Sequence, residues 1–139
     1  MALTKLCPCC SGLEYASCCK PYHIGGQAPT PVALMRSRYS AYVLGLDAYI
    51  IRTTHPKNPL YEKNLKKWAE EIRRFSQESQ FIKLEIESFG EDWVAFVAHL
   101  SQNGYPVFLK EKSRFAKLDG KWLYLSGILT ETKPSDSKS

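Results

Sequence analysis

All five cysteines of this 139-residue chain lie in the stretch CPCCSGLEYASCC, which begins at Cys7 and ends at Cys19. Four of them have the spacing C-x-C-x8-C-C, with one pair of thiols on each side of a short connection. So short a segment cannot bury a hydrophobic core, and its fold must therefore come from a cross-link or a bound ion. No other feature of the sequence limits the fold as strongly.

A tetrahedral metal site is the interpretation that this spacing favours. Zinc or ferrous iron binds four thiolates at tetrahedral corners, and Pro8 pre-bends the chain between the first two thiols. Two disulfides are an alternative, but adjacent cysteines such as Cys18 and Cys19 make strained bridges. A redox pair of Cys7 and Cys10 is another, but no strand precedes it as in a thioredoxin-like unit. The predicted ligands of zinc, or alternatively of iron, are Cys7, Cys9, Cys18 and Cys19.

The remaining composition is that of a globular protein. The chain has 44% hydrophobic residues and a net charge of +5, which allows one main domain with a small satellite. The mild positive charge is compatible with an acidic or RNA-rich partner but does not require one. The start, MALTKLCPCC, lacks the apolar run of a signal peptide, and no stretch approaches the ~18 apolar residues of a membrane span. We therefore expect a cytoplasmic protein with no membrane contact.

Changes in composition divide the chain into four regions. The cysteine segment is followed by GGQAPT, whose glycines and proline are typical of a linker. The final stretch, ETKPSDSKS, contains no apolar residue and predicts a flexible tail. The expected regions are a metal-binding motif at 1–24, the linker at 25–30, one folded domain at 31–130 and the tail at 131–139.

The first half of the folded region has the periodicity of helices. Thr30-Pro31 supplies the residue types preferred at a helix N-cap and first position, and Gly45 predicts the end of this helix. Asp47–Ile51 predicts a second, short helix, and Asn58-Pro59 predicts the start of a third. The apolar stripe of the third helix consists of Tyr61, Leu65, Trp68, Ile72 and Phe75.

The second half of the region alternates as strands do. Apolar and polar residues alternate over 81–89, and further strands are predicted at 93–100, 107–118 and 122–126. Asn103-Gly104 and Asp119-Gly120 are strong hairpin-turn signals. Tight turns between consecutive strands make an antiparallel meander, so the sequence predicts an α+β fold in which about three helices cover one face of a sheet of four or more strands.

The cysteine segment resembles the SEC-C motif, usually CPCGSGKKYKKCC, in which four ligands bind zinc. The resemblance implies a small module that contacts proteins such as an export chaperone, and ribosomes. Cys10 stands where the motif has Gly, and a Cys at that position is strained if its φ is positive. Leu13-Glu14 replaces the usual lysines and lowers the positive charge. The matching residues are Cys7, Pro8, Cys9, Ser11, Gly12, Tyr15, Cys18 and Cys19.

From residue 7 to about residue 127 the chain is similar to the YchJ-like family of uncharacterised bacterial proteins. The resemblance is carried by CCKPYHIGGQAPTPVALMRSRYSAYVLGLDAYIIRTTHP, by EKSRF at 111–115 and by DGKWLY at 119–124. It implies a SEC-C motif followed by a domain similar to nuclear transport factor 2, in which a curved antiparallel sheet wraps around a pocket closed by helices. The family brings no established reaction with it.

Polar residues on the expected helices and strands are candidates for lining such a pocket. An enzyme would pair His55 or Glu111, as a general base, with an arginine that holds an anion. Fold alone does not decide between catalysis and binding, and no phosphate loop or Ser-His-Asp signature is present. The candidate pocket residues are Arg36, Arg38, Tyr39, His55, Glu111 and Arg114.

Structural roles compete with each of these assignments. His55 precedes Pro56 at a helix end, where His commonly caps carbonyls. Tyr39 lies on the apolar stripe of its helix, and Arg36 or Arg38 can pair with Glu111. His23 is a packing or turn residue rather than a metal ligand, because four thiolates already close a site.

Two functions from different classes remain. The first is a zinc-binding adaptor whose motif docks a chaperone or the ribosome and whose larger domain takes a second partner. The alternative is a small enzyme or ligand-binding protein that uses the pocket, and a homodimer formed through sheet faces is compatible with either. Direct nucleic-acid binding is disfavoured, since Glu62, Glu70 and Glu71 interrupt the basic patch of Lys63, Lys66 and Lys67.

Overall fold

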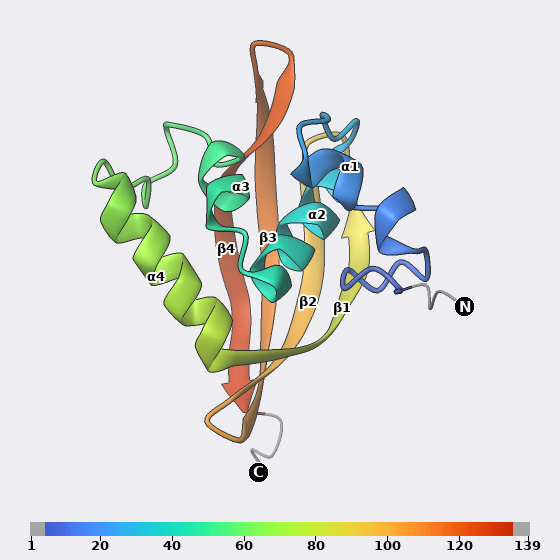
Figure 1. Cartoon of the computed structure of the whole chain (residues 1–139), viewed down its shortest axis with the longest axis vertical. Helices are drawn as coiled ribbons and strands as arrows, with labels where there is room; N and C mark the ends of the chain where they lie inside the picture. Colours follow the sequence, from blue (N-terminus) through green and yellow to red (C-terminus); the bar gives the residue numbers. More distant parts are fainter. Residues whose placement is uncertain (1–4, 135–139) are drawn as a thin grey trace.

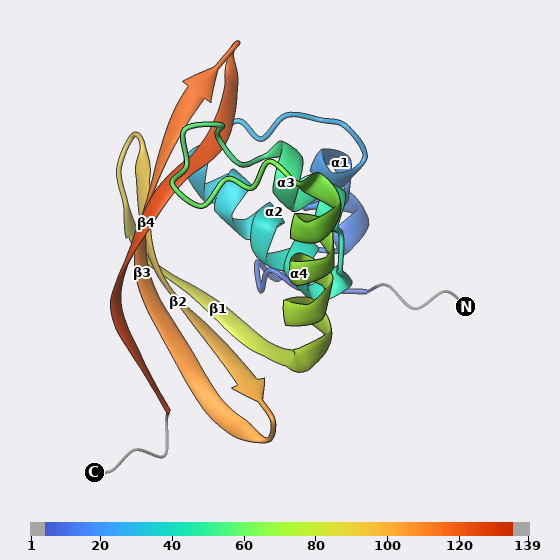
Figure 2. The same ribbon diagram turned by 90° about the vertical axis from the view of Figure 1, so that its left-hand side faces the viewer.

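The computed structural model describes residues 5–134, with side chains as far as Leu129, and has the expected α+β architecture (Figure 1). Helices α2, α3 and α4 lie together on one face of a curved antiparallel sheet (Figure 2). The elements are a 3-10 turn (Tyr15–Ser17), α1 (Lys20–His23), α2 (Pro31–Leu44), α3 (Asp47–Arg52), α4 (Leu65–Glu78), β1 (Ser79–Phe89), β2 (Trp93–Gln102), β3 (Tyr105–Leu118) and β4 (Lys121–Pro134).

The sheet is a meander in the order β1-β2-β3-β4, as the turn signals predict. Asn103 and Gly104 have φ angles of 53° and 81°, and Asp119 and Gly120 have 53° and 78°. Two successive left-handed residues are what a two-residue hairpin turn of the favoured hand requires. Register shifts in the β1–β2 and β3–β4 ladders mark bulges, which bend the strands and help to give the helices a concave face.

The ends of α2 follow the sequence signals. The Thr30 hydroxyl accepts a hydrogen bond from the backbone N–H of Ala33 at 3.1 Å, and Pro31 occupies the first turn. Gly45 ends the helix in the left-handed region with φ 73°, which glycine adopts without steric cost.

The third helix of the main domain starts later than expected. Asn64, not Asn58, is its N-cap, and its side chain accepts from the N–H of Lys67 at 3.1 Å. Asn58 instead holds a loop, because its Oδ1 accepts from Leu60 N and its Nδ2 donates to the carbonyl of Leu125. An Asn before Pro serves an Asx turn as readily as a helix cap, and only the contact with β4 decides between them.

The last strand is longer than expected. β4 continues to Pro134, and backbone pairs join Leu109 to Thr132 and Val107 to Pro134. Residues 131–134 of the expected tail are therefore part of the sheet, because β3 is long enough to offer them backbone partners. Backbone pairing needs no apolar side chain, so the polar composition of residues 131–134 did not reveal that they belong to the strand. Residues 135–139 of the expected tail lie outside the described residues.

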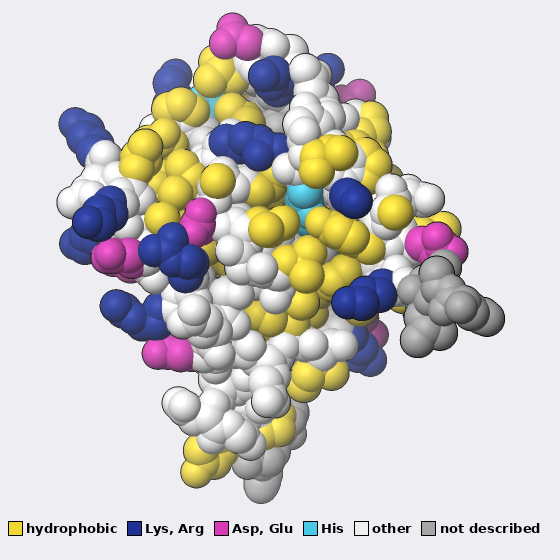
Figure 3. Space-filling view, in the orientation of Figure 1, with side chains coloured by type: hydrophobic (Ala, Val, Ile, Leu, Met, Phe, Trp, Pro, Cys, Tyr) yellow, Lys and Arg dark blue, Asp and Glu magenta, His cyan; other side chains and the backbone are white. Residues whose placement is uncertain are grey.

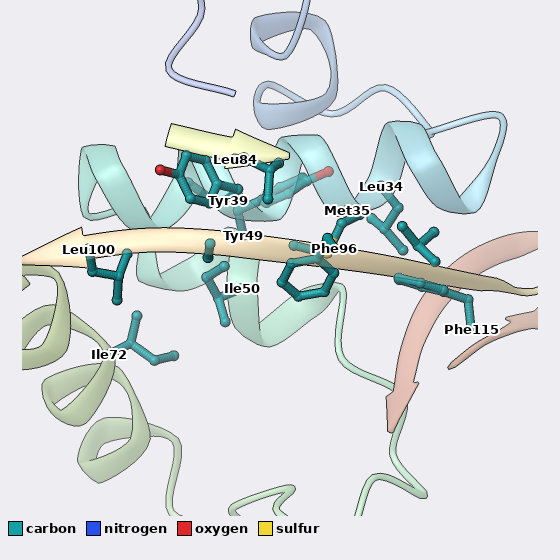
Figure 4. Packing of buried hydrophobic residues seen from close by; sticks show 13 residues of the cluster. Leu34, Met35, Tyr39, Tyr49, Ile50, Ile72, Leu84, Phe96, Leu100 and Phe115 are labelled. Carbon is teal, nitrogen blue, oxygen red and sulfur yellow. The ribbon is translucent and has the colours of Figure 1, made fainter. Parts of the chain in front are cut away.

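The core lies between α2, α3 and the concave face of the sheet. Leu34 and Ile50 from the helices are 2% and 1% exposed, and Val94 and Phe115 from the sheet are 0% and 2% exposed. Figure 4 shows Phe96 of β2 beside Met35 of α2, with Phe115 on the sheet side of Leu34. Burial of these side chains holds the helices on the sheet.

The outer surface of α4 carries mixed charge. Basic and acidic side chains alternate on the side of the molecule where α4 lies (Figure 3). Helix α4 thus has the solvated face that its sequence predicts. None of the helices between residues 5 and 134 is long and apolar enough to span a bilayer.

Two buried tyrosines differ in how their hydroxyls are satisfied, which gives a matched pair of variants. Tyr49 shares a 2.6 Å hydrogen bond with Ser37 Oγ, whereas the buried Tyr39 hydroxyl has no partner among the described residues. Tyr49→Phe should lower the free energy of unfolding by about 1 kcal/mol. Tyr39→Phe should leave it unchanged or raise it, because it removes an unsatisfied polar group. Urea unfolding measures both, and an equal loss in the two variants would contradict this account of the core.

Candidate metal centre

The first two cysteines of the cluster sit on a small hairpin. Leu6 and Glu14 form an isolated antiparallel bridge, and Cys7 N donates to Leu13 O at 2.7 Å. The turn between these arms is tight, and Gly12 within it has φ 87°, a conformation that favours glycine. The hairpin therefore presents Cys7 and Cys9 from the same side.

The other two cysteines come from the segment after the hairpin. The 3-10 turn brings the chain back, with Cys18 N donating to Tyr15 O at 3.0 Å. Cys19 is the N-cap residue of α1. The short turn and the start of α1 therefore place two adjacent thiols against the hairpin.

The four sulfurs fit a single tetrahedral ion. All of them lie within 4.8 Å of one another, with Cys9 Sγ 3.6 Å from Cys18 Sγ and Cys18 Sγ 3.9 Å from Cys19 Sγ. Thiolates bound to one ion at about 2.3 Å lie about 3.8 Å apart at tetrahedral corners. None of the cysteines is disulfide-bonded. This cluster can hold a metal ion.

Three of the four cluster thiols are buried, and the cluster favours a thiolate. Cys7, Cys9 and Cys19 are 4%, 0% and 1% exposed, as in structural metal sites. A hydrogen bond from Cys19 lowers the pKa of Cys9 to about 4, against the effect of burial. The same hydrogen bond, together with burial, raises the pKa of Cys19. A negative charge at the centre of the cluster suits a cation.

Cys10 does not join the other four. Its φ is 68°, so the strain expected for a Cys in place of Gly is present. Its side chain is exposed and contacts Pro8 O at 3.6 Å. Geometry thus separates the fifth thiol from the cluster.

Three side chains fasten the cysteine segment, residues 5–24, to the helices of the main domain. Arg36 Nη1 donates to the carbonyl of Cys9 at 2.8 Å, so one candidate pocket arginine belongs to this contact instead. Arg52 Nη2 donates to Tyr22 O at 2.8 Å. The cysteine segment is therefore anchored on α2 and α3 across the linker.

His23 is the third of these side chains. Its Nε2 lies 2.8 Å from Ser37 O, which can only accept, and its Nδ1 lies 2.7 Å from Tyr15 Oη. Nε2 therefore donates to α2, and in the neutral ring Nδ1 accepts from Tyr15. The rings of His23 and Tyr49 also pack edge to face, with their centroids 4.7 Å apart. Sequence reasoning predicted a packing role for His23 but not its contacts with Ser37 and Tyr15.

Three further candidate pocket residues, Arg38, His55 and Arg114, are held by separate contacts. Arg38 is buried and donates to Ile50 O and to the hydroxyls of Thr53 and Thr54. His55 lies after α3, and its Nδ1 accepts from Lys57 N at 3.0 Å. Arg114 lies on the convex side of the sheet, with its Nη2 3.6 Å from Asp92 Oδ2. These contacts explain all three residues structurally.

Glu111 lies apart from the arginines, and no ion pair joins it to them within the described part of the chain. It accepts hydrogen bonds from Ser113 Oγ at 2.7 Å and Tyr124 Oη at 3.0 Å. Arg38 stacks on the Tyr124 ring, with its Cζ 4.5 Å from the ring centroid. Sequence reasoning did not identify Tyr124 as a partner of Glu111. The alternation of side chains along a strand could indicate only Ser113, which lies two residues from Glu111 on the same face.

The state of His23 should make the attachment of the cysteine segment sensitive to pH. Burial lowers the pKa of His23 below its usual 6.5. The unfolded chain then binds the proton first, so the stabilisation is complete above pH 6.5 and is lost as pH falls below that value. The free energy of unfolding should therefore fall more between pH 7 and 5 in the native protein than in His23→Gln. Parallel curves for the two proteins would contradict this role.

Comparisons with known proteins agree with this architecture. Residues 30–127 match the family model described as YchJ, middle NTF2-like domain. The solution structure of a SEC-C motif containing protein from Rhodopseudomonas palustris superposes with a TM-score of 0.74 at 32% identity, over 90% of this chain and 98% of that one. A SEC-C motif containing protein from Psychrobacter arcticus gives 0.70 at 27% identity, over 90% and 82%.

Curated relatives match along most of their length. A UPF0225 protein of Deinococcus radiodurans is 42% identical over 123 residues, which is 87% of each chain. A UPF0225 protein of Serratia proteamaculans is 36% identical over 99% of this chain and 89% of that one. The chain therefore belongs to the YchJ-like UPF0225 family, with a SEC-C cysteine motif ahead of an NTF2-like domain.

Proposed function

We propose that Cys7, Cys9, Cys18 and Cys19 bind one structural zinc ion and that the closed motif is a docking module for another protein. A tetrahedral set of four thiolates with no open position is typical of structural zinc. Iron remains the competing metal for the same donors. The cysteines are reduced, which suits a protein that works in the cytoplasm.

Two exposed leucines of the hairpin carry the docking proposal. Leu6 lies opposite Glu14 and Leu13 lies opposite Cys7, and the two leucines are 66% and 55% exposed. Their backbones are held by the same hairpin that presents the thiols, so a partner meets a preformed surface. Exposed leucines on a small rigid module are available for protein contacts.

The chemistry of this face indicates the kind of partner. The neighbouring charges are mixed, with Lys5 and Lys20 close in sequence to Glu14. Apolar contact is therefore expected to dominate over charge attraction. A protein surface, such as that of an export chaperone or a ribosomal protein, suits it better than bare nucleic acid.

The metal assignment predicts different results for two neighbouring cysteines. The native protein and Cys10→Gly should each contain about one metal ion per chain. Cys10→Gly should also gain up to about 1 kcal/mol of stability, because it removes a left-handed non-glycine residue. Cys9→Ser should lose the metal and unfold the segment. Elemental analysis and urea unfolding measure these effects. Metal loss from Cys10→Gly, or metal retention in Cys9→Ser, would show that the ligand set is wrong.

The docking face can be tested with purified partners. Biolayer interferometry with the export chaperone and with ribosomes should show binding that falls about tenfold or more in Leu6→Ser/Leu13→Ser, because buried leucines contribute about 1.5–3 kcal/mol each. Leu60→Ser is the matched control, since Leu60 is 84% exposed on the loop before α4. If the double variant binds both partners as the native protein does, or if neither partner binds the native protein, the docking role is refuted.

A further inference from the structure

A cavity of about 190 Å³ lies between the helices and the concave face of the sheet. Its walls are apolar or aromatic apart from one carboxylate and two tyrosine hydroxyls. Figure 4 shows four of the lining residues, Met35 and Tyr39 on α2 and Phe96 and Leu100 on β2. The full lining is Met35, Tyr39, Tyr42, Phe75, Phe81, Phe96, Ala98, Leu100, Leu109 and Glu111.

Glu111 is the only charged residue in this lining. Both of its hydrogen bonds, from Ser113 and Tyr124, reach the same oxygen, Oε2. Among the described side chains, none donates to Oε1 and no cation lies within 4 Å of the carboxylate. Among the side chains that the structure describes, Oε1 of Glu111 therefore has no hydrogen-bond donor, although it lies beside a largely apolar cavity.

The neighbouring strand is shaped around this carboxylate. A Cβ atom added to Gly127 of β4 would lie 1.9 Å from Glu111 Oε2 and 2.5 Å from Tyr124 Oη. Glycine at this position thus makes room for the hydrogen-bonded pair. Arg38 covers the face of Tyr124, but it donates its hydrogen bonds to α3 and the residues after it. Ser113 and Tyr124 hold the carboxylate in place, and no described cationic side chain pairs with it.

The remaining walls of the cavity are largely aromatic and suit the apolar part of an organic cation. Five aromatic residues line the cavity, and three pairs of them meet edge to face: Tyr39 with Phe81, Tyr42 with Phe75, and Phe75 with Phe81. Aromatic faces attract cations and apolar groups alike. A carboxylate in such surroundings is costly unless a positive group pairs with it.

We propose that this cavity binds a small organic ammonium ion, with the ammonium group on Glu111 and the apolar part among the aromatic rings. A dry cavity of about 150 Å³ accommodates benzene, so about 190 Å³ takes one ring with a short amine arm. Tyr42 and Phe75 also line an open hollow on the outer surface. They form the wall between the cavity and solvent, through which the ligand enters.

The proposal is tested on the full-length protein with phenethylamine as the probe. Two probes of similar size, 2-phenylethanol and phenylacetate, replace the ammonium by a neutral and a negative group. Isothermal titration calorimetry gives the affinities, and ¹⁵N chemical-shift changes at Ala98 and Leu109 locate the site. Phenethylamine should bind at least tenfold more tightly than 2-phenylethanol, because a charged hydrogen bond is stronger than a neutral one. Phenylacetate should bind most weakly.

Variants then test whether Glu111 causes the preference for phenethylamine over 2-phenylethanol. Glu111→Gln should lower the affinity for phenethylamine about tenfold or more and leave that for 2-phenylethanol nearly unchanged. Glu85→Gln is the control, since Glu85 is exposed and lies on the other face of the sheet. If Glu111→Gln does not fold, the three-probe comparison on the native protein still decides. No binding of phenethylamine at millimolar concentration, equal affinities for amine and alcohol, or shifts away from Ala98 and Leu109 would overturn the proposal.

Discussion

The fold of residues 5–24 depends on one constraint, which is that four sulfur atoms lie close together. A segment with no core of its own is folded so that three of its thiols are buried, and its hairpin, its 3-10 turn and α1 are all placed by that requirement. A positive φ at Gly12 and at Cys10 belongs to the same tight turn. Residues 5–24 then become a rigid surface feature, because the cluster fixes their backbone.

Hydrogen bonds between residues distant in sequence attach this segment to the main domain. Arg36 and His23 tie it to α2, and Arg52 on α3 donates to the carbonyl of Tyr22. Helix α2 is shared by two sites, since Arg36 and Ser37 face the cysteine segment while Met35, Tyr39 and Tyr42 line the cavity. The proposed docking segment and the proposed ligand cavity therefore lie on opposite sides of one helix.

Local signals allowed much of this to be predicted. The cysteine spacing, the Thr30 cap and the Asn103-Gly104 turn each act within a few residues, and the structure has them as expected. Long-range pairing escaped prediction. Asn58 is committed to Leu125 rather than to a helix, and the end of β4 is placed by the length of β3. A single sequence carries no mark of such partners.

The candidate pocket shows the same limit. Residue type alone grouped Arg36, Arg38, His55 and Arg114 with Glu111, but most of these side chains are occupied by nearby carbonyls, hydroxyls or acids. Of the candidate residues, Tyr39 and Glu111 line the cavity. Gly127, which makes room for the Glu111 carboxylate, could not be recognised because its neighbour across the sheet was not known from the sequence.

X-ray absorption at the metal edge of the purified full-length protein tests the central claim most directly. The account predicts one shell of four sulfur atoms at about 2.3 Å around zinc, because the four Sγ atoms already lie at tetrahedral spacing. A shell containing nitrogen would mean that His23 has left Ser37 and Tyr15 to become a ligand. That result, or the absence of any bound metal in a folded protein, would contradict the account.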